Sequence, residues 1–190
     1  MYGLVNRALQ QLIVSDYGHD VWQRIAHAAG WTEVEFVSME RYDDALTYGL
    51  VSSASKELRV PAPELLEAFG LAWPRYVVGK GFGVLMEMSG DTFGEFLGNL
   101  DHLHTRIALS YTSLQPPSFD LERSEPGAWD LRYYSSRPGF APMVMGMLYA
   151  LAEKFNTKID ISSQEIQMEG GEFSFLFTVR EEADQAARAA

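Results

Sequence analysis

The spacing of the apolar residues changes at residues 113–119, SLQPPSF. Before this segment, apolar residues recur at steps of three and four, which is typical of amphipathic helices. After it, several segments alternate between apolar and polar residues, which is typical of half-buried strands. We therefore expect an α+β fold, with an N-terminal helical lobe and a C-terminal lobe in which helices pack on a four-stranded antiparallel sheet.

The individual elements follow from local signals. The clearest helix start is DTFGEF, where Thr92 is the expected N-cap and Glu95 its capping-box partner. Other helices are expected around residues 4–13, 21–29, 44–58 and 142–155, and from residue 64 to Pro74, which should kink or end its helix. Strands are expected at 119–123 and 129–135, and at 158–168 and 172–180 around the turn EGG.

The length of 190 residues and a hydrophobic content of 47% suit one domain with a sizeable core. We expect this domain to cover residues 1–181, with a helical lobe over about 1–60 and a second lobe over about 61–181. Residues 182–190, EADQAARAA, are expected to form a polar, alanine-rich tail.

Charge and cysteine content narrow the possible partners. The net charge is −11 and no basic stripe is visible, so neither nucleic acid nor an anionic membrane is an expected partner. The sequence has no cysteine, which excludes disulfides and cysteine-ligated zinc or iron–sulfur sites. Because the sequence also lacks a signal-peptide pattern and an apolar run of membrane-spanning length, we expect a cytoplasmic protein.

One histidine lies within an apolar helical stripe. The stripe contains Leu97, Leu100, His104, Ile107, Ala108 and Tyr111. A histidine in such a stripe is usually a hydrogen-bonded core residue, and the alternative is a metal ligand. The histidines show no spacing that suits zinc. A single histidine suffices for haem, because the macrocycle supplies the other four nitrogens.

The segment LRYYSSRPG, residues 131–139, contains a second pattern. On a strand, Tyr133, Ser135 and Arg137 point to the same face. An arginine fork and two hydroxyls are good donors for carboxylates, so this row could hold the two propionates of a haem. The strand by itself leaves a second interpretation open, in which the row is the polar solvent face of an edge strand.

Together these motifs resemble the haem nitric oxide/oxygen-binding (H-NOX) family, the fold that also forms the haem domain of soluble guanylate cyclase. The family has a proximal histidine, a downstream proline and a Tyr-x-Ser-x-Arg motif. Here LDHLH contains His104, PPSF contains Pro117, and YYSSR contains Tyr133, Ser135 and Arg137. MYGLVN and PMVMG are also similar, and the resemblance, to members of the stand-alone bacterial type, covers residues 1–181.

The resemblance implies a site for haem b between the two lobes. His104 would be the axial iron ligand, and Tyr133, Ser135 and Arg137 would bind the propionates. Pro117 would press on the porphyrin and distort it.

The resemblance also implies which gas binds. Oxygen-binding members use a distal tyrosine, and alignment on PMVMG places Met143 there, with Leu9 and Trp73 where those members have tryptophan and asparagine. A missing hydrogen bond to bound oxygen costs about 1–3 kcal/mol. We therefore expect selective nitric oxide binding, with carbon monoxide as a further ligand. The expected pocket residues, each of which could equally be plain core, are Val5, Leu9, Leu66, Trp73, Met143 and Met147; Tyr2 and Tyr76 are possible donors from other directions.

The chain carries no kinase, cyclase or phosphodiesterase motif, so we expect a sensor and not an enzyme. The resemblance suggests a histidine kinase or a cyclic-di-GMP enzyme as partner, signalled through release of the iron–His104 bond and relaxation of the haem. Two alternatives remain. One is a haem enzyme of the peroxidase type, which usually needs a distal His/Arg pair, and the other is a haem-free module that binds a small dicarboxylate.

Overall fold

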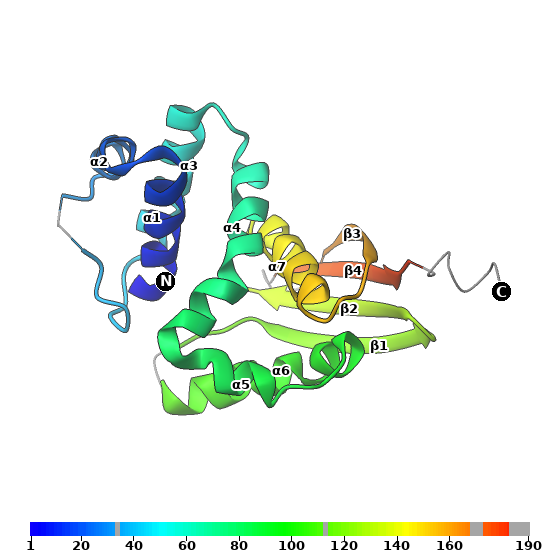
Figure 1. The fold of residues 1–190 in the computed structure, drawn as a ribbon. Helices are drawn as coiled ribbons and strands as arrows, with labels where there is room; N and C mark the ends of the chain where they lie inside the picture. The colour runs from blue at the N-terminus through cyan, green and yellow to red at the C-terminus, as the bar shows by residue number, and fades with distance from the viewer. Residues whose placement is uncertain (33–34, 112–113, 168–172, 183–190) are drawn as a thin grey trace. The chain divides into compact units, whose positions relative to one another are not determined.

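The computed structural model describes residues 1–32, 35–111, 114–167 and 173–182 (Figure 1). It contains helices and one four-stranded antiparallel sheet, which confirms the expected α+β class. The chain divides into two compact units. Unit 1 is Met1–Tyr76 with Pro142–Met147, and unit 2 is Val77–Ala141 with Leu148–Ala190. The division expected near residue 60 falls inside unit 1.

Unit 1 contains four helices and the start of a fifth. They are α1 (Gly3–Tyr17), α2 (His19–Ala28), α3 (Asp44–Leu58), α4 (Ala62–Val77) and the first half of α7 (Ala141–Lys154). The start of α3 is capped by the Asp43 carboxylate, which accepts a hydrogen bond of 2.8 Å from the Ala45 N–H. The core of the unit includes the buried side chains of Leu9, Ile13, Ile25, Leu50 and Phe69.

Helix α4 does not end at Pro74. The proline is buried inside the helix, which continues to Val77. A proline ring has a helical φ angle, and here the loss of the hydrogen bond to the carbonyl of Gly70 does not end the helix. The chain leaves helical geometry later, at Gly81, where φ is +95° within the short π-helical segment η1 (Val78–Phe82).

Helices α4 and α7 touch through their backbones. A methyl group on Gly70 would overlap the carbonyl oxygen of Met143, and one on Gly146 would overlap the carbonyl oxygen of Glu67. Because both glycines lack a side chain, the helices approach until main chain meets main chain. This close approach places Met143 directly against α4.

We expect Gly146→Ala to lower the free energy of unfolding by about 1–3 kcal/mol, because the new methyl group forces the two backbones apart. Gly49→Ala is the matched control, since a methyl group there meets Ala29 at an ordinary 3.7 Å. Urea unfolding of both variants measures the difference. Equal stability of Gly146→Ala and the unsubstituted protein would contradict the close helix contact.

Unit 2 is built around the sheet. Its strands are β1 (Ser118–Glu125), β2 (Ala128–Ser135), β3 (Ile159–Gln167) and β4 (Phe173–Glu181), in the spatial order β1-β2-β4-β3. Helix α5 (Gly83–Glu87) follows η1, and α6 (Phe93–Ser110) runs beside β1 (Figure 1). The four expected strands are confirmed, whereas the turn EGG lies outside the described residues.

The expected N-cap of α6 is confirmed with one difference. Thr92 Oγ1 accepts a hydrogen bond of 3.2 Å from the Glu95 N–H. The Glu95 carboxylate returns to the N–H of Asp91, at 2.9 Å, rather than to that of Thr92 itself. Both bonds satisfy donors at the helix start, so α6 begins at a well-defined residue.

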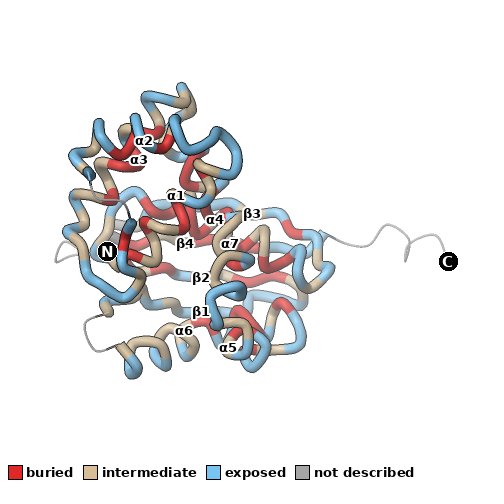
Figure 2. Tube along the Cα trace, turned by 60° about the vertical axis from the view of Figure 1, so that its left-hand side comes forward, coloured by how far each residue is buried: buried red, intermediate tan, exposed pale blue. Residues whose placement is uncertain are grey.

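One face of the sheet forms the core of unit 2 (Figure 2). Along β2, Trp129, Leu131, Tyr133 and Ser135 are buried, and Phe177 and Val179 of β4 are fully buried beside them. The alternate residue Arg132 is exposed and lies 3.8 Å from the Glu122 carboxylate on β1. The opposite face of the sheet is therefore the polar one.

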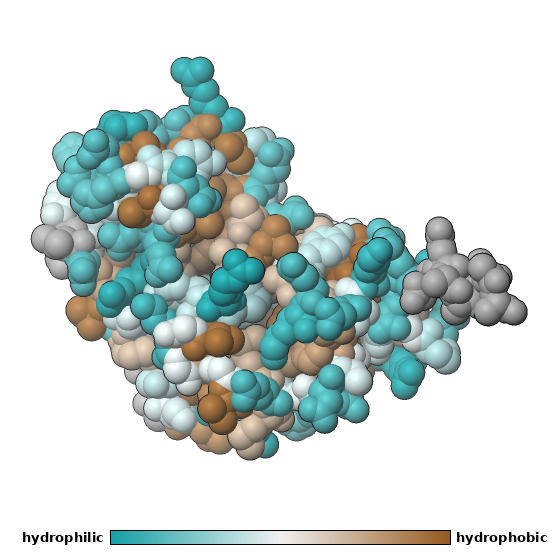
Figure 3. All heavy atoms as spheres, in the orientation of Figure 1, coloured by the Kyte–Doolittle hydropathy of each residue, from teal (hydrophilic) through white to brown (hydrophobic). Residues whose placement is uncertain are grey.

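The molecular face in Figure 3 carries mainly hydrophilic side chains, with hydrophobic ones in small areas among them. Among the residues that the structure describes, none of the helices combines the length and apolar character needed to cross a bilayer.

Candidate functional site

His104 extends the buried face of α6 by one further turn. Phe93, Phe96, Leu97 and Leu100 form this face, and His104 follows Leu100 at a helical step of four. The His104 Nδ1 atom lies 2.8 Å from the Leu100 carbonyl oxygen. A carbonyl can only accept, so Nδ1 carries the proton and Nε2 keeps its lone pair.

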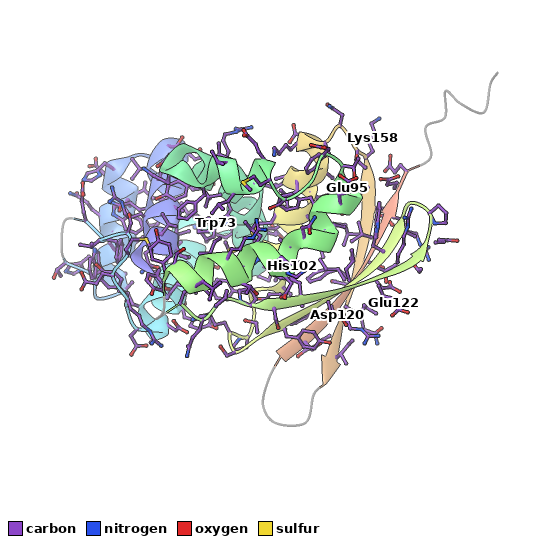
Figure 4. The ribbon with its side chains drawn as sticks, turned by 90° about the horizontal axis from the view of Figure 1, so that it is seen from below. Trp73, Glu95, His102, Asp120, Glu122 and Lys158 are labelled. Atoms are coloured by element: carbon purple, nitrogen blue, oxygen red, sulfur yellow. The ribbon has the colours of Figure 1, made fainter. Side chains whose placement is uncertain are left out.

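The environment of His104 favours its neutral form. Burial lowers the pKa of His104, whereas the bond to the Leu100 carbonyl and the charge of Asp101 act in the opposite direction. A neutral imidazole with a fixed Nδ1 proton presents Nε2 as a metal ligand. His102, labelled in Figure 4, is exposed. In the described part of the chain, no three or more His, Cys, Asp or Glu side chains gather as a metal site.

The Tyr-x-Ser-x-Arg row faces inward, so its interpretation as a solvent face is wrong. Tyr133 and Ser135 are buried and Arg137 is partly buried. Burial raises the pKa of the Tyr133 phenol, while its hydrogen bond with Ser135 and the charge of Arg137 lower it. The backbone N–H of Arg137 donates to Ser135 Oγ at 3.0 Å. The Ser135 hydroxyl is thus bonded to the phenol of Tyr133 and to the backbone of Arg137.

The segment with the two prolines connects to this row. The Arg137 guanidinium donates to the carbonyl oxygen of Gln115 at 2.9 Å. Pro116 and Pro117 follow Gln115 directly, and both are partly buried. The conformation of the chain just before Pro117 is therefore tied to Arg137.

The residues of unit 2 fit a haem in chemical type. His104 offers one imidazole nitrogen, which is what a macrocycle with four nitrogens needs as an axial ligand. Tyr133, Ser135 and Arg137 offer hydroxyl and guanidinium donors, which suit carboxylates. A dicarboxylate without a porphyrin would use the same row but would leave His104 Nε2 without a role.

The six expected pocket residues all belong to unit 1. Leu9, Leu66 and Met143 are buried in its core, whereas Val5, Trp73 and Met147 are partly exposed. Trp73, labelled in Figure 4, packs edge-on against Phe69 with ring centroids 5.8 Å apart. The side chains share an apolar character.

The two tyrosines noted as possible donors have different surroundings. Tyr2 forms an isolated backbone bridge with Arg41. The Tyr76 ring lies 6.1 Å from that of Trp73, and burial raises the pKa of the Tyr76 phenol against the lowering effect of Arg7.

Two residues near the site were not predicted from the sequence. The Asp101 carboxylate accepts a hydrogen bond of 2.9 Å from the Phe119 N–H, and the Phe119 ring lies 5.1 Å from that of His104. Asp101 and Phe119 are 18 residues apart, so no local spacing connects them. The contact depends on the packing of α6 against β1, which no local sequence signal gives.

A model of the Haem-NO-binding family matches residues 2–163 of the chain. A soluble guanylate cyclase of Caenorhabditis elegans, gcy-35, is 30% identical over 175 residues, which is 89% of this chain and 25% of the relative. The guanylate cyclase soluble subunit beta-2 of Rattus norvegicus is 32% identical over 131 residues, which is 66% of this chain and 19% of the relative. The chain thus spans about a quarter or less of the length of these relatives.

Solved structures show the same fold. An H-NOX protein from S. oneidensis, in the Fe(II)NO ligation state, superposes with a TM-score of 0.83 at 20% identity, covering 96% of this chain and 99% of that one. The unliganded Fe(II) H-NOX protein from K. algicida also has a TM-score of 0.83, at 19% identity, covering 97% and 98%. The architecture is therefore retained at low sequence identity.

We expect Tyr133→Phe to reduce the loss of stability in alkali. The pKa of Tyr133 is raised in the fold, so the unfolded chain loses this proton first and stability falls as the pH rises above the ordinary value of 10. Phenylalanine has no proton to lose. Urea unfolding at pH 7 and pH 11 should show a smaller difference for the variant, and equal differences would contradict the burial of the phenol.

Proposed function

The chain belongs to the Haem-NO-binding (H-NOX) family, a family of haem-based gas-sensor domains and not of enzymes, and from this premise we propose that it is a sensor selective for nitric oxide over oxygen. The proposed cofactor is haem b. We propose a cytoplasmic location as well, which the acidic, cysteine-free composition supports. The observation that carries the proposal is the combination, in unit 2, of His104 with a directed Nε2 lone pair, the buried Tyr133 and Ser135, and the partly buried Arg137.

In this proposal each residue has a separate task. His104 holds the iron through Nε2, while Leu100 keeps the Nδ1 proton in place. Tyr133, Ser135 and Arg137 donate to the propionates. Pro117 presses on the porphyrin, and the Arg137–Gln115 bond restrains the chain in front of it.

The selectivity rests on the chemical character of the expected distal residues. Val5, Leu9, Leu66, Trp73, Met143 and Met147 are proposed to contribute to the gas side, and none of their side chains ends in a hydroxyl. Oxygen bound to ferrous iron draws negative charge and gains from a donor, whereas nitric oxide and carbon monoxide depend less on one. The absence of a hydroxyl donor, such as that of a distal tyrosine, weakens oxygen binding by about ten- to a hundred-fold.

The proposed response begins at His104. His104 would hold the iron of a bound haem through Nε2, and the haem would supply the centre that takes up the gas. We propose that the response is release of His104 from this attachment, which would free α6 from its tether to the haem. The helix is also attached to the sheet by contacts with β1, by the Asp101–Phe119 hydrogen bond and by the Phe93 ring, whose centroid lies 5.6 Å from that of Trp129 on β2.

The output is proposed to lie outside these residues. The curated relatives are guanylate cyclases about four times longer than the matched segment. For this chain we propose an output on a histidine kinase or a cyclic-di-GMP enzyme, to which the resemblance to stand-alone bacterial members points; an output on a further C-terminal portion of the same protein is the alternative.

Absorption spectra test the proposal directly. The purified, reduced and anaerobic protein should show a five-coordinate ferrous haem, become five-coordinate with nitric oxide, and form no lasting oxygen complex in air. A stable oxygen complex would contradict the selectivity and would indicate that Tyr2 or Tyr76 donates a hydrogen bond to the bound oxygen. A colourless protein that cannot be loaded with haem would favour the dicarboxylate module, and peroxidase turnover would favour an enzyme.

The tether-release step predicts a change in the mobility of α6. Nitric oxide should increase hydrogen exchange of the α6 amides in the unsubstituted protein. It should not do so in His104→Gly loaded with haem and free imidazole, because that ligand is not attached to the helix. Exchange in α2 serves as the internal control. An equal response of α6 in both proteins would refute release of His104 as the trigger.

Met143→Tyr should bring a donor to the gas side. We expect oxygen affinity to rise by about ten- to a hundred-fold, the value of one hydrogen bond to bound oxygen, with carbon monoxide affinity nearly unchanged. Leu148→Tyr in the same helix is not a suitable control because Leu148 is buried in unit 2. Met143→Phe adds the ring without the hydroxyl and is the matched control, and a similar gain in both variants would contradict the donor argument.

A further inference from the structure

Three rings form a continuous row through unit 2. The His104 and Phe119 rings have centroids 5.1 Å apart at 45°, and the Phe119 and Tyr133 rings 5.5 Å apart at 41°. The rings belong to α6, β1 and β2 respectively. Phe119 is therefore the only one of the three that touches both an imidazole on the helix and a phenol in the centre of the sheet.

The backbone of Phe119 is also held by two elements, α6 and β2. Its N–H donates to Asp101 Oδ1 at 2.9 Å, and Asp101 lies on α6 three residues before His104. On its other side, Phe119 pairs with Tyr133 in the antiparallel ladder. Because one residue is bonded to both elements, a shift of α6 is transmitted to the first residues of β1.

Two restraints act on the imidazole of His104. The first is the Nδ1 bond to the Leu100 carbonyl, which belongs to the same helix and moves with it. The second is the Phe119 ring, which comes from the sheet. A hydrogen bond on one edge still allows the ring to tilt about that bond, and a neighbouring ring limits the tilt.

We propose that Phe119 is a positioning residue, which sets the tilt of the His104 imidazole and couples it to Tyr133. This inference rests on the proposed function, in which His104 holds the haem iron and Tyr133 a propionate. In this inference the Phe119 side chain connects the two proposed attachment points of the haem, His104 and Tyr133. A change at His104 then reaches the sheet through Phe119, together with the bond to Asp101.

The Phe119 side chain is only partly buried, so its role can be distinguished from that of a residue that only fills the core. The Phe119 side chain is not among the fully buried ones, whereas Phe177, two strands away, has 0% of its surface exposed. A role in packing alone would appear as a loss of stability. A positioning role also changes the bond between the imidazole and the iron.

Resonance Raman spectroscopy of the haem-loaded ferrous protein measures that bond. We expect Phe119→Leu to shift and broaden the iron–histidine stretching band, because the imidazole gains freedom to tilt. Phe119→Tyr keeps the ring and should restore the band. Phe155→Leu is the matched control, since Phe155 is a partly buried phenylalanine of the same unit whose ring lies 5.8 Å from that of Phe96.

A second pair of variants tests the backbone connection and remains usable if Phe119→Leu does not fold. Asp101→Asn and Asp101→Ala both remove the charge, but only asparagine keeps the acceptor for the Phe119 N–H. We expect the band to shift further in Asp101→Ala than in Asp101→Asn. Equal bands in the two variants would contradict the role of this hydrogen bond.

The outcomes distinguish the inference from the function on which it rests. An unsubstituted protein without an iron–histidine band, or with a band that persists in His104→Gly, would overturn the proposed function. A normal band that is the same in Phe119→Leu, Phe155→Leu and the unsubstituted protein would overturn the positioning role alone. A shift in Phe119→Leu that is absent from Phe119→Tyr and Phe155→Leu would support it.

Discussion

The organisation of unit 2 depends on the register in which β2 pairs with its neighbours. Tyr133 lies opposite Phe119 of β1 on one side and Phe175 of β4 on the other. A slip of one residue would turn Tyr133 and Ser135 outward and Arg132 inward. Because an unpaired buried guanidinium is costly, the exposed position of Arg132 and the apolar residues beside Tyr133 specify this register.

This register places polar side chains inside the unit. The environments of His104 and Tyr133 both favour the neutral forms of these residues, because burial lowers the first pKa and raises the second. Among the motif residues this leaves Arg137 as the charged one, held by the Gln115 carbonyl. A buried cluster with a cation and neutral donors is suited to an anionic group.

Much of the fold follows from local sequence signals. Helix α3 has the expected bounds, 44–58, and the strands agree to within one or two residues. The N-cap at Thr92 was predicted because a hydroxyl and a glutamate three residues later act on adjacent backbone groups. Pro74 shows the limit of such signals, since a proline removes one hydrogen bond and the packing of the helix decides whether that loss ends it.

By itself, the sequence determined which residues share a face: His104 with the apolar stripe of its helix, and Tyr133 with Ser135 on β2. Arg137 lies beyond the end of β2, so strand alternation does not place it. Periodicity is a property of neighbouring residues, so it can be read along the chain. The sequence left open whether the row of β2 points to solvent or to the core. The tertiary structure decided this, and it also brought Phe119 and Asp101 to His104. Those contacts join α6, β1 and β2, and the strand pairing and the packing of the helix on the sheet set them, neither of which is encoded in the spacing of one segment.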